Sequence, residues 1–212
     1  MADVKKVSRQ ERAAATRRRM LDAAYDMFCE QGFRATTMEA IAQRAGVAVQ
    51  TLYFTFHTKD ALLQEVHNRT VLGEESIPPD RQAWRLAAQR EPDIRRCVAM
   101  TVDGTATVLS RVAPMIPVFH AVSGDPAGAI YQHGEDRRRR GYAEMTDELV
   151  GKAPLRPGVT KQRANDLLFV LLGPEMYRSL VIEAGWTEKQ WASWTTNALL
   201  RDLFGVDPDD GS

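Results

Sequence analysis

The block of residues from Thr36 to Lys59 holds the side chains whose types and spacing point most clearly to a chemistry, and that chemistry is hydrogen bonding to DNA. Two short helical patterns flank Gly46, and two short helices joined by a tight glycine turn form a helix-turn-helix. In the second pattern, Gln50 can bind an adenine edge in a bidentate manner. Small side chains beside it can meet a thymine methyl group, namely Ala48, Val49 and Thr51. The pattern therefore predicts a helix narrow enough for a major groove about 12 Å wide.

A second set of side chains is suited to phosphate groups, which fix the register of a protein on DNA rather than its sequence preference. The first short helix would present free N–H groups at its N-terminus, where Thr36 and Thr37 add hydroxyl groups. Tyr53 and Lys59 are expected to hold phosphates beside the second helix. The complete set of predicted DNA contacts is Arg17, Thr36, Thr37, Ala48, Val49, Gln50, Thr51, Tyr53, Phe54 and Lys59.

Four helices are expected to position these groups. A long helix from about Glu11 to Glu30 carries apolar residues at i, i+3, i+4 and i+7, which are Leu21, Ala24, Tyr25 and Phe28. Gly32 suits the left-handed position that ends a helix. Thr36 is predicted to cap the next helix, because Glu39 completes a capping box. Thr58 is predicted to cap a fourth helix that follows the pattern from Val47 to Phe56.

The competing interpretation of this block is a generic three-helix bundle. Met38, Ile41 and Leu52 would be buried in either case, so they do not discriminate. The shortness of the helices, Gly46 and the polar start of the third helix favour DNA binding.

The net charge of zero is unevenly distributed along the chain. Residues 1–19 carry seven Lys or Arg against two acidic side chains, a net charge of +5, so the remainder carries −5. This asymmetry predicts a basic arm at residues 1–10 beside a slightly acidic body. Charge alone leaves open a solvated tail or an ordinary helix start.

The same block resembles the DNA-binding domain of the tetracycline-repressor (TetR) family. The similar pattern is Gly46-Val47-x-x-x-Thr51-Leu52-Tyr53-x-x-Phe56-x-x-Lys59, and with Ala23, Phe28, Gly32-Phe33 and Thr36-Thr37 it covers nearly all of residues 15–66. The resemblance implies that backbone contacts or support of the recognition helix come from Thr37, Thr51, Tyr53 and Lys59. Two positions depart from it: Ala48 stands where Ser is frequent, and Thr55 where an aromatic ring or His is usual.

The rest of the chain is also predicted to be helical, so the expected fold class is all-α. Ile77-Pro78-Pro79-Asp80 breaks the chain. A helix with Trp84 and Leu86 is expected before Pro92, and further helices at about 93–112, 116–119, 127–150, 160–184 and 187–204. We predict a helix-turn-helix DNA-binding domain at residues 1–58, a connecting helix and break at 59–79, a helical effector-binding and dimerisation domain at 80–206, and a disordered tail at 207–212.

The last two helices, about 160–204, are predicted to form a homodimer interface. Residues 167–172 are apolar in succession, and a helix that is apolar on nearly all sides must bury more than one face. The TetR resemblance implies a four-helix interface here, and a dimer suits two DNA half-sites about one helical turn apart. A single buried core helix is the alternative.

The middle helices are where the resemblance implies an effector pocket, for an unidentified small and largely apolar molecule. Its predicted lining is Trp84, Met100, Leu109, Met115, Phe119, His120, Tyr131 and Tyr142. Each of these residues, taken alone, fits plain core better than a ligand contact. Gly104 and Gly173-Pro174 suggest bends or close approaches. The run Arg137–Arg140 surrounds a whole helix turn and is interpreted as a solvated helix, with a site for an acidic ligand group as the alternative.

No enzyme, metal site or cofactor is predicted. The four histidines lack metal-ligand spacing, and G-x-S-x-G, Walker and dinucleotide motifs are absent. No apolar run approaches the ~20 residues of a membrane span, and the polar N-terminus suggests no signal peptide. Cys29 and Cys97 fit reduced thiols, with a disulfide as the alternative. The expected location is cytoplasmic.

The sequence thus predicts a DNA-binding transcriptional regulator, a ligand-responsive repressor that binds a palindromic operator as a dimer. The alternative is a helical small-molecule-binding or scaffolding dimer without specific DNA binding.

Overall fold

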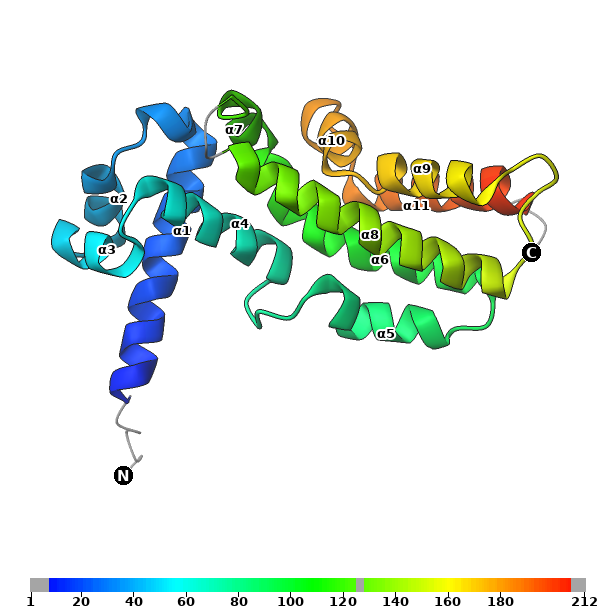
Figure 1. Cartoon of the computed structure of the whole chain (residues 1–212), viewed down its shortest axis with the longest axis horizontal. Helices are drawn as coiled ribbons and strands as arrows, with labels where there is room; N and C mark the ends of the chain where they lie inside the picture. Colours follow the sequence, from blue (N-terminus) through cyan, green and yellow to red (C-terminus); the bar gives the residue numbers. More distant parts are fainter. Residues whose placement is uncertain (1–7, 125–127, 207–212) are drawn as a thin grey trace. The chain divides into compact units, whose positions relative to one another are not determined.

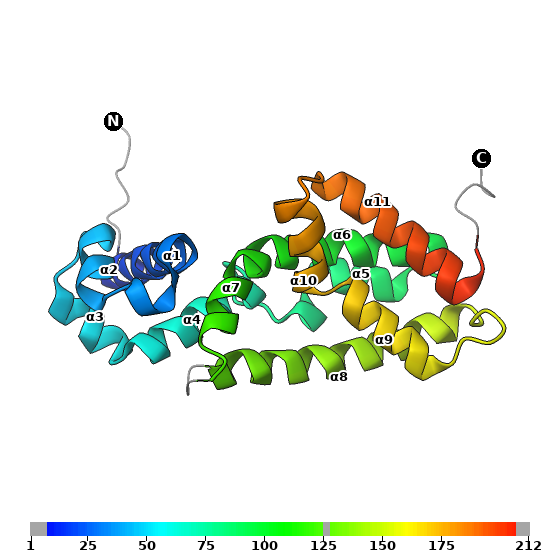
Figure 2. The ribbon, with the colours of Figure 1, turned by 90° about the horizontal axis from the view of Figure 1, so that it is seen from above.

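The computed structural model describes residues 8–124 and 128–206, and all regular elements in these ranges are helices (Figures 1 and 2). The predicted all-α class is therefore confirmed. The chain divides into two compact units, one of residues 1–68 with 117–130 and one of residues 69–116 with 131–212. Most of the predicted basic arm and the predicted tail at 207–212 lie outside the described residues.

The first unit contains the predicted helix-turn-helix. Its helices are α1 (Arg9–Ala35), α2 (Met38–Ala45), α3 (Val49–Phe56), most of α4 (Lys59–Leu72) and most of α7 (Ile116–Ala121). A capping box between Ser8 and Glu11 starts α1, and α1 packs against α2, which packs against α3 (Figure 1). The ring of His67 in α4 meets the ring of Phe119 in α7 edge to face, with 5.0 Å between centroids.

Two predictions about the ends of these helices are corrected. Helix α1 extends to Ala35, but Gly32 is not helical (φ 83°, ψ 166°), so the helix that begins at Arg9 is interrupted where the sequence predicts a stop. This is positive φ with extended ψ rather than the left-handed cap that we expected. The N-cap of α2 is Thr37, whose hydroxyl accepts a hydrogen bond from the Ala40 N–H (3.2 Å), and not Thr36. Because the cap lies one residue later, Glu39 does not form the predicted capping box.

The turn between α2 and α3 follows the prediction. Gly46 adopts the left-handed conformation (φ 66°, ψ 42°) and its N–H bonds back to carbonyls of α2, which is the usual reason for glycine at a helix end. Thr58 caps α4 as expected, since its hydroxyl accepts from the Ala61 N–H at 3.0 Å.

The second unit is a helical bundle. Its elements are η1 (Pro79–Arg81), α5 (Ala83–Arg90), α6 (Ile94–Val112), η2 (Ala113–Met115), most of α8 (Gly128–Lys152), α9 (Lys161–Leu171), α10 (Pro174–Tyr177), η3 (Arg178–Glu183), α11 (Glu188–Leu199) and η4 (Leu200–Phe204). Helices α5 and α11 both pack against α6 (Figure 2). The core includes Trp191, which is fully buried, and its ring meets that of Tyr177 edge to face.

The two glycine positions singled out above have structural reasons. A Cβ at Gly104 would lie 2.1 Å from the Trp84 ring, so glycine is required for that indole to lie on α6. The predicted helix at 160–184 is in fact broken, because Gly173 is extended (φ −90°, ψ 149°) and caps a new helix at Pro174. Proline disfavours helical geometry at the residue before it, which explains the break.

Candidate nucleic-acid interface

Helix α3 presents a mixed polar and aromatic face to solvent. Leu52 and Phe56 lie one turn apart and are almost completely buried, so they anchor one side of α3 in the first unit. On the other side Gln50 and Thr51 are exposed. The Phe54 side chain is 84% exposed, more than any other exposed large hydrophobic side chain that the structure describes. Together with Tyr53 (42% exposed), Phe54 gives α3 an exposed aromatic surface.

One flank of α3 lies next to the start of α2. The Tyr53 hydroxyl donates to Glu39 Oε1 at 3.4 Å, and Glu39 follows the cap residue Thr37 by two positions. Both Thr37 and Tyr53 are exposed. The predicted backbone contacts from Thr37 and Tyr53 are thus brought to one side of α3, together with the N-terminus of α2, where free N–H groups favour anions.

Two predicted DNA contacts have different roles in this structure. Thr36 has no exposed surface, and its hydroxyl donates to the Gly32 carbonyl at 2.7 Å. The Lys59 ammonium donates to the carbonyls of Phe33 (2.8 Å) and Thr36 (2.9 Å) and lies 4.3 Å from the centroid of the Phe33 ring. The assignment of Thr36 as a DNA contact is therefore wrong, because its side chain is buried. The bonds of Lys59 hold it at the junction of α1, α2 and α4, and its phosphate contact stays a prediction.

The remaining predicted contacts lie around the same helix. Ala48 is the N-cap of α3 and, lacking a polar side chain, makes no capping hydrogen bond. Val49 is half-buried. Arg17 comes from α1, and its guanidinium lies 2.8 Å from Glu65 of α4 and 4.7 Å from the Phe56 ring centroid. Apart from Thr36 and Lys59, the structure gathers the predicted DNA contacts on or beside α3.

An ion pair that the sequence did not single out fixes α2 on α1. The Arg44 guanidinium binds both oxygens of the Glu30 carboxylate, at 2.5 and 2.7 Å. The hydrogen bond from Arg44 lowers the pKa of Glu30 below its usual range. The two residues lie fourteen positions apart, so no helical spacing could have revealed the pair.

Comparison with known proteins places the first unit in a family. The model for bacterial regulatory proteins of the tetR family matches residues 20–66. The HTH-type transcriptional regulator UidR of Escherichia coli is 40% identical over 136 residues, which span 64% of this chain but only 59% of UidR. The uncharacterized HTH-type transcriptional regulator YdeS of Bacillus subtilis is 34% identical over 170 residues, 80% of this chain and 81% of YdeS. The chain belongs to the TetR family.

The fold of this TetR-family chain is also similar to solved structures. NalD, described as the secondary repressor of the MexAB-OprM multidrug efflux pump in Pseudomonas aeruginosa, has a TM-score of 0.67 at 20% identity, covering 92% of this chain and 98% of NalD. At that identity the likeness concerns the fold, and it extends over both units.

The residues predicted to line an effector pocket are divided between the two units of this TetR-family chain. Phe119 and His120 belong to the first unit and the other six to the second. In the second unit Trp84 packs on Gly104, and the indole N–H donates to Gln82 at 2.7 Å. Leu109 and Met115 are buried. Packing within the protein explains the positions of Trp84, Leu109 and Met115.

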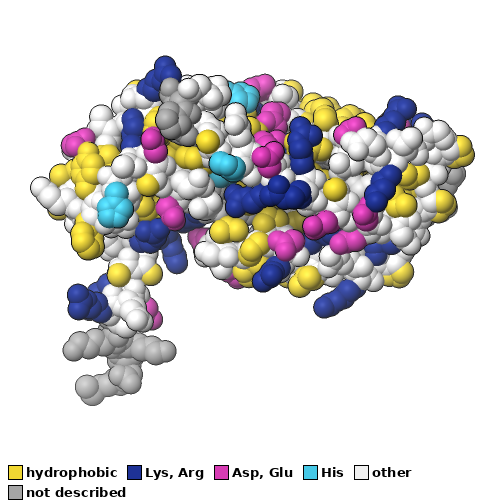
Figure 3. All heavy atoms as spheres, viewed as in Figure 1, with side chains coloured by type: hydrophobic (Ala, Val, Ile, Leu, Met, Phe, Trp, Pro, Cys, Tyr) yellow, Lys and Arg dark blue, Asp and Glu magenta, His cyan; other side chains and the backbone are white. Residues whose placement is uncertain are grey.

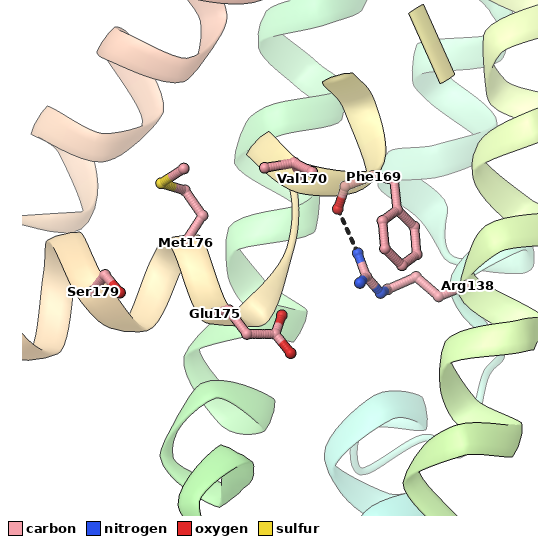
Figure 4. A pocket seen from close by; sticks show the side chains of 6 residues that line it. All are labelled: Arg138, Phe169, Val170, Glu175, Met176 and Ser179. Atoms are coloured by element: carbon pink, nitrogen blue, oxygen red, sulfur yellow. Dashed lines mark hydrogen bonds between the residues drawn. The ribbon is translucent and has the colours of Figure 1, made fainter. Parts of the chain in front are cut away.

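A cavity of about 290 Å³ does lie in the second unit, between α8 and the broken helix pair α9 and α10. Its lining is Arg138, Phe169, Val170, Glu175, Met176 and Ser179 (Figure 4). Two of the predicted pocket residues form hydrogen bonds beside it: Tyr131 donates to Glu175, and Tyr142 donates to the Leu172 carbonyl. Burial raises the pKa of Tyr142 to about 12, so its hydroxyl keeps its proton.

The arginine run Arg137–Arg140 is not uniformly solvated. Arg138 is largely buried, donates to the Phe169 carbonyl (2.7 Å) and pairs with Glu135 (2.6 Å). Its guanidinium lies 3.6 Å from the centroid of the Phe169 ring, and that of Arg139 lies 4.0 Å away. The interpretation as a solvated helix is therefore wrong for Arg138, because α9 covers its side of α8.

Within residues 8–124 and 128–206, no cluster of three or more His, Cys, Asp or Glu is arranged to hold a metal ion. None of the helices in those ranges is long and apolar enough to cross a membrane. Cys29 and Cys97 are not joined in a disulfide.

Proposed function

We propose that this protein is a ligand-responsive transcriptional repressor that binds palindromic operator DNA as a homodimer, with α3 in the major groove. The single observation that carries the proposal is the exposed face of α3, where Gln50, Thr51 and Phe54 lie on a helix anchored by buried residues. Family membership and the name of NalD, a repressor, support repression as the mode of action.

The side chains on this face suit the major groove. Gln50 offers a donor and an acceptor in one plane, which match the N6 and N7 edge of adenine. Phe54 lies one turn further on the same face, and its apolar ring suits a thymine methyl group. Tyr53 and Thr37 would hold phosphates on the flank next to α2.

The dimer is proposed to form through α9–η4. Among the described residues the exposed large hydrophobic side chains include Val170 (53%) in α9, Ile182 (44%) in η3 and Trp194 (40%) in α11. The rings of Trp186 and Trp194 meet edge to face, 6.1 Å between centroids. Apolar side chains left in solvent on neighbouring helices favour a partner subunit.

The effector is proposed to be a small, largely apolar molecule bound in the second unit. The 290 Å³ cavity beside Tyr131 and Tyr142 is one place for it, and Met176 and Phe169 supply an adaptable apolar lining. The six predicted pocket residues of the second unit stay part of the proposal. An effector would act by binding more tightly to a conformation that does not fit the operator. We propose a cytoplasmic location and assign the chain no catalytic step.

The proposal is tested by selecting duplexes from a random-sequence library with the purified full-length chain. The enriched duplex and a scrambled control are then titrated at two salt concentrations. We expect an enriched palindrome, a specific Kd of roughly 10⁻⁸ M or tighter and a steep salt dependence. If no sequence is enriched and binding stays at the nonspecific level, the alternative of a non-DNA-binding helical dimer holds instead.

A further inference from the structure

The cavity between α8 and α10 has a polar end, where Arg138 of α8 and Glu175 of α10 point toward each other (Figure 4). Most of the rest of its lining is apolar and comes from Phe169, Val170 and Met176. Its volume of about 290 Å³ is at the small end for a ligand site. At the ~30 Å³ that a water molecule occupies in the liquid, the cavity has room for about ten non-hydrogen atoms.

The positive charge at the polar end is already paired. The Arg138 guanidinium donates to both oxygens of Glu135, at 2.9 and 2.6 Å, and to the Phe169 carbonyl at 2.7 Å. Arg139 also lies over the Phe169 ring, but its side chain is exposed and does not line the cavity. An anionic ligand would therefore meet a guanidinium whose charge a carboxylate already offsets.

The negative charge of Glu175 is not offset in this way. Its Oε1 accepts a hydrogen bond from the Tyr131 hydroxyl. Burial, together with this bond, raises the pKa of Tyr131, so the hydroxyl stays protonated and neutral. Arg178, which follows on the same helix, pairs with Glu183 at 3.1 Å. In the described part of the chain Glu175 thus forms no ion pair, and its second oxygen, Oε2, is available to a ligand.

The charges around the cavity therefore favour a cation. Glu135, Arg138 and Glu175 together carry a net charge of −1. Over the second unit, on the face that Figure 3 shows, acidic and basic side chains are interspersed, so no surrounding field of one sign opposes this local charge. A neutral ligand would remove water from the Glu175 carboxylate without supplying an opposite charge, which is unfavourable.

The polar groups that remain at this end suit an ammonium group. Ser179 lies four residues after Glu175, and both side chains line the cavity. An ammonium group has three N–H donors and no acceptor, so it can donate to a carboxylate oxygen and to a hydroxyl oxygen at once. The apolar part of the same molecule would lie against Val170 and Met176.

We propose that this cavity binds a small organic cation, a primary amine whose ammonium group donates to Glu175 Oε2 and to the Ser179 hydroxyl while its apolar part packs on Val170 and Met176. The inference rests on the proposed function, because it names the chemical class of the effector. Glu175 is then the residue that selects a cation over a neutral or an anionic molecule of the same shape.

The test compares three small molecules of similar shape and different charge, namely benzylamine, benzyl alcohol and benzoate. Each is titrated into the full-length protein without DNA, and its Kd is measured by ligand-observed NMR. We expect a Kd of about 1 mM for benzylamine, as its small size allows. Binding of the other two should be weaker by about tenfold or more, because they lose the charge-assisted hydrogen bond to Glu175.

Glu175→Gln separates charge from shape, since glutamine keeps an oxygen for the Tyr131 hydroxyl. Glu144→Gln is the matched control, because Glu144 is exposed on α8 and does not line the cavity. Glu175→Gln should bind benzylamine about tenfold more weakly and benzyl alcohol as the wild type does. Glu144→Gln should bind all three molecules like the wild type. Thermal unfolding verifies that both variants fold.

The Met176 methyl group reports where the amine binds. In protein labelled with ¹³C at the methionine methyl groups, the Met176 signal is identified as the one that Met176→Leu removes. Benzylamine should shift this signal, and benzoate at the same concentration should not. Saturating benzylamine should also weaken binding of the enriched duplex by the wild type and by Glu144→Gln, but not by Glu175→Gln.

The DNA-free titrations keep the two proposals apart. If no duplex is enriched, the proposed function fails, and the titrations still decide which charge the cavity selects. If benzylamine binds no more tightly than benzyl alcohol, or if Glu175→Gln binds it as tightly as Glu144→Gln does, this inference alone is overturned. It is also overturned if benzylamine binds but leaves the affinity of the wild type for the enriched duplex unchanged.

Discussion

At the scale of single residues, the structure shows which of the predicted contact residues are exposed and which have hydrogen-bond partners within the protein. Lys59 is predicted from the sequence to contact phosphate. In the structure its ammonium donates hydrogen bonds to two backbone carbonyls and lies over the Phe33 ring. Lysine at this position of the TetR pattern has a structural role at the junction of α1, α2 and α4. Its ammonium binds carbonyl groups that would otherwise lack hydrogen-bond partners at the end of a helix.

The positioning role of Lys59 makes a specific prediction. Lys59→Met should lower the free energy of unfolding by about 2 kcal/mol, because two charge-assisted hydrogen bonds are lost and their carbonyls stay half-buried. The measurement is urea unfolding in the absence of DNA, with the exposed Lys189→Met as the control. An unchanged unfolding free energy with weaker DNA binding would restore the phosphate role instead.

Gly104 offers a second test at this scale. Gly104→Ala should destabilise the chain by roughly 1–3 kcal/mol, since its Cβ would overlap the Trp84 ring. Gly141→Ala in α8 is the matched control, because nothing lies within 4 Å of the added Cβ and alanine there should stabilise the helix by roughly 0.5–1 kcal/mol. Equal thermal shifts for the two variants would show that Trp84 does not pack on α6 as described.

At the scale of elements, the helix-turn-helix was predictable because its signals are local. Gly46 and the short apolar repeats determine where α2 ends and α3 begins. The sequence could not say which of the neighbouring Thr36 and Thr37 caps α2, since that depends on carbonyls of α1 that bury Thr36. The break at Gly173 was only suspected, and α9 covering Arg138 required the tertiary structure.

The attachment of α2 to α1 should depend on pH. The pKa of Glu30 is lowered by Arg44 in the folded chain, so the pair stabilises the fold above the ordinary glutamate pKa of about 4.3, and this stabilisation is lost as the pH falls through the lowered value. Glu30→Gln should therefore reduce Tm at pH 7 and lose its effect at strongly acidic pH. A Tm difference that persists there would mean that packing, not charge, is what Gln disrupts.

At the scale of the whole molecule, large hydrophobic side chains are exposed on the two surfaces that we propose to be functional. Tyr53 and Phe54 lie on α3, while Val170, Ile182 and Trp194 lie in the last helices. The sequence predicted both surfaces from pattern and family likeness. It could not select pocket residues, because a buried aromatic in a core and one in a cavity share the same periodicity.

The second surface predicts the oligomeric state. Ile182→Glu should convert the dimer to a monomer at micromolar concentration in sedimentation experiments, because a charge would be buried at the interface. Leu86→Glu, at a similarly exposed position on α5 (38%), should remain dimeric. The monomer should also bind a palindrome far more weakly, since the second half-site no longer benefits from linkage. A dimeric Ile182→Glu would place the interface elsewhere.

The claim on which the account depends is that Gln50 reads adenine in the major groove from each half of a dimer. The most direct measurement titrates the enriched palindrome with each adenine replaced in turn by 7-deazaadenine, which removes the N7 acceptor. We predict that the replacement at one symmetric pair of positions weakens binding by the wild type about tenfold. The same replacement should not weaken binding by Gln50→Ala any further. If no replacement of adenine weakens binding by the wild type, α3 does not read DNA as described. The same follows if the replacements weaken binding by Gln50→Ala as much as they weaken binding by the wild type.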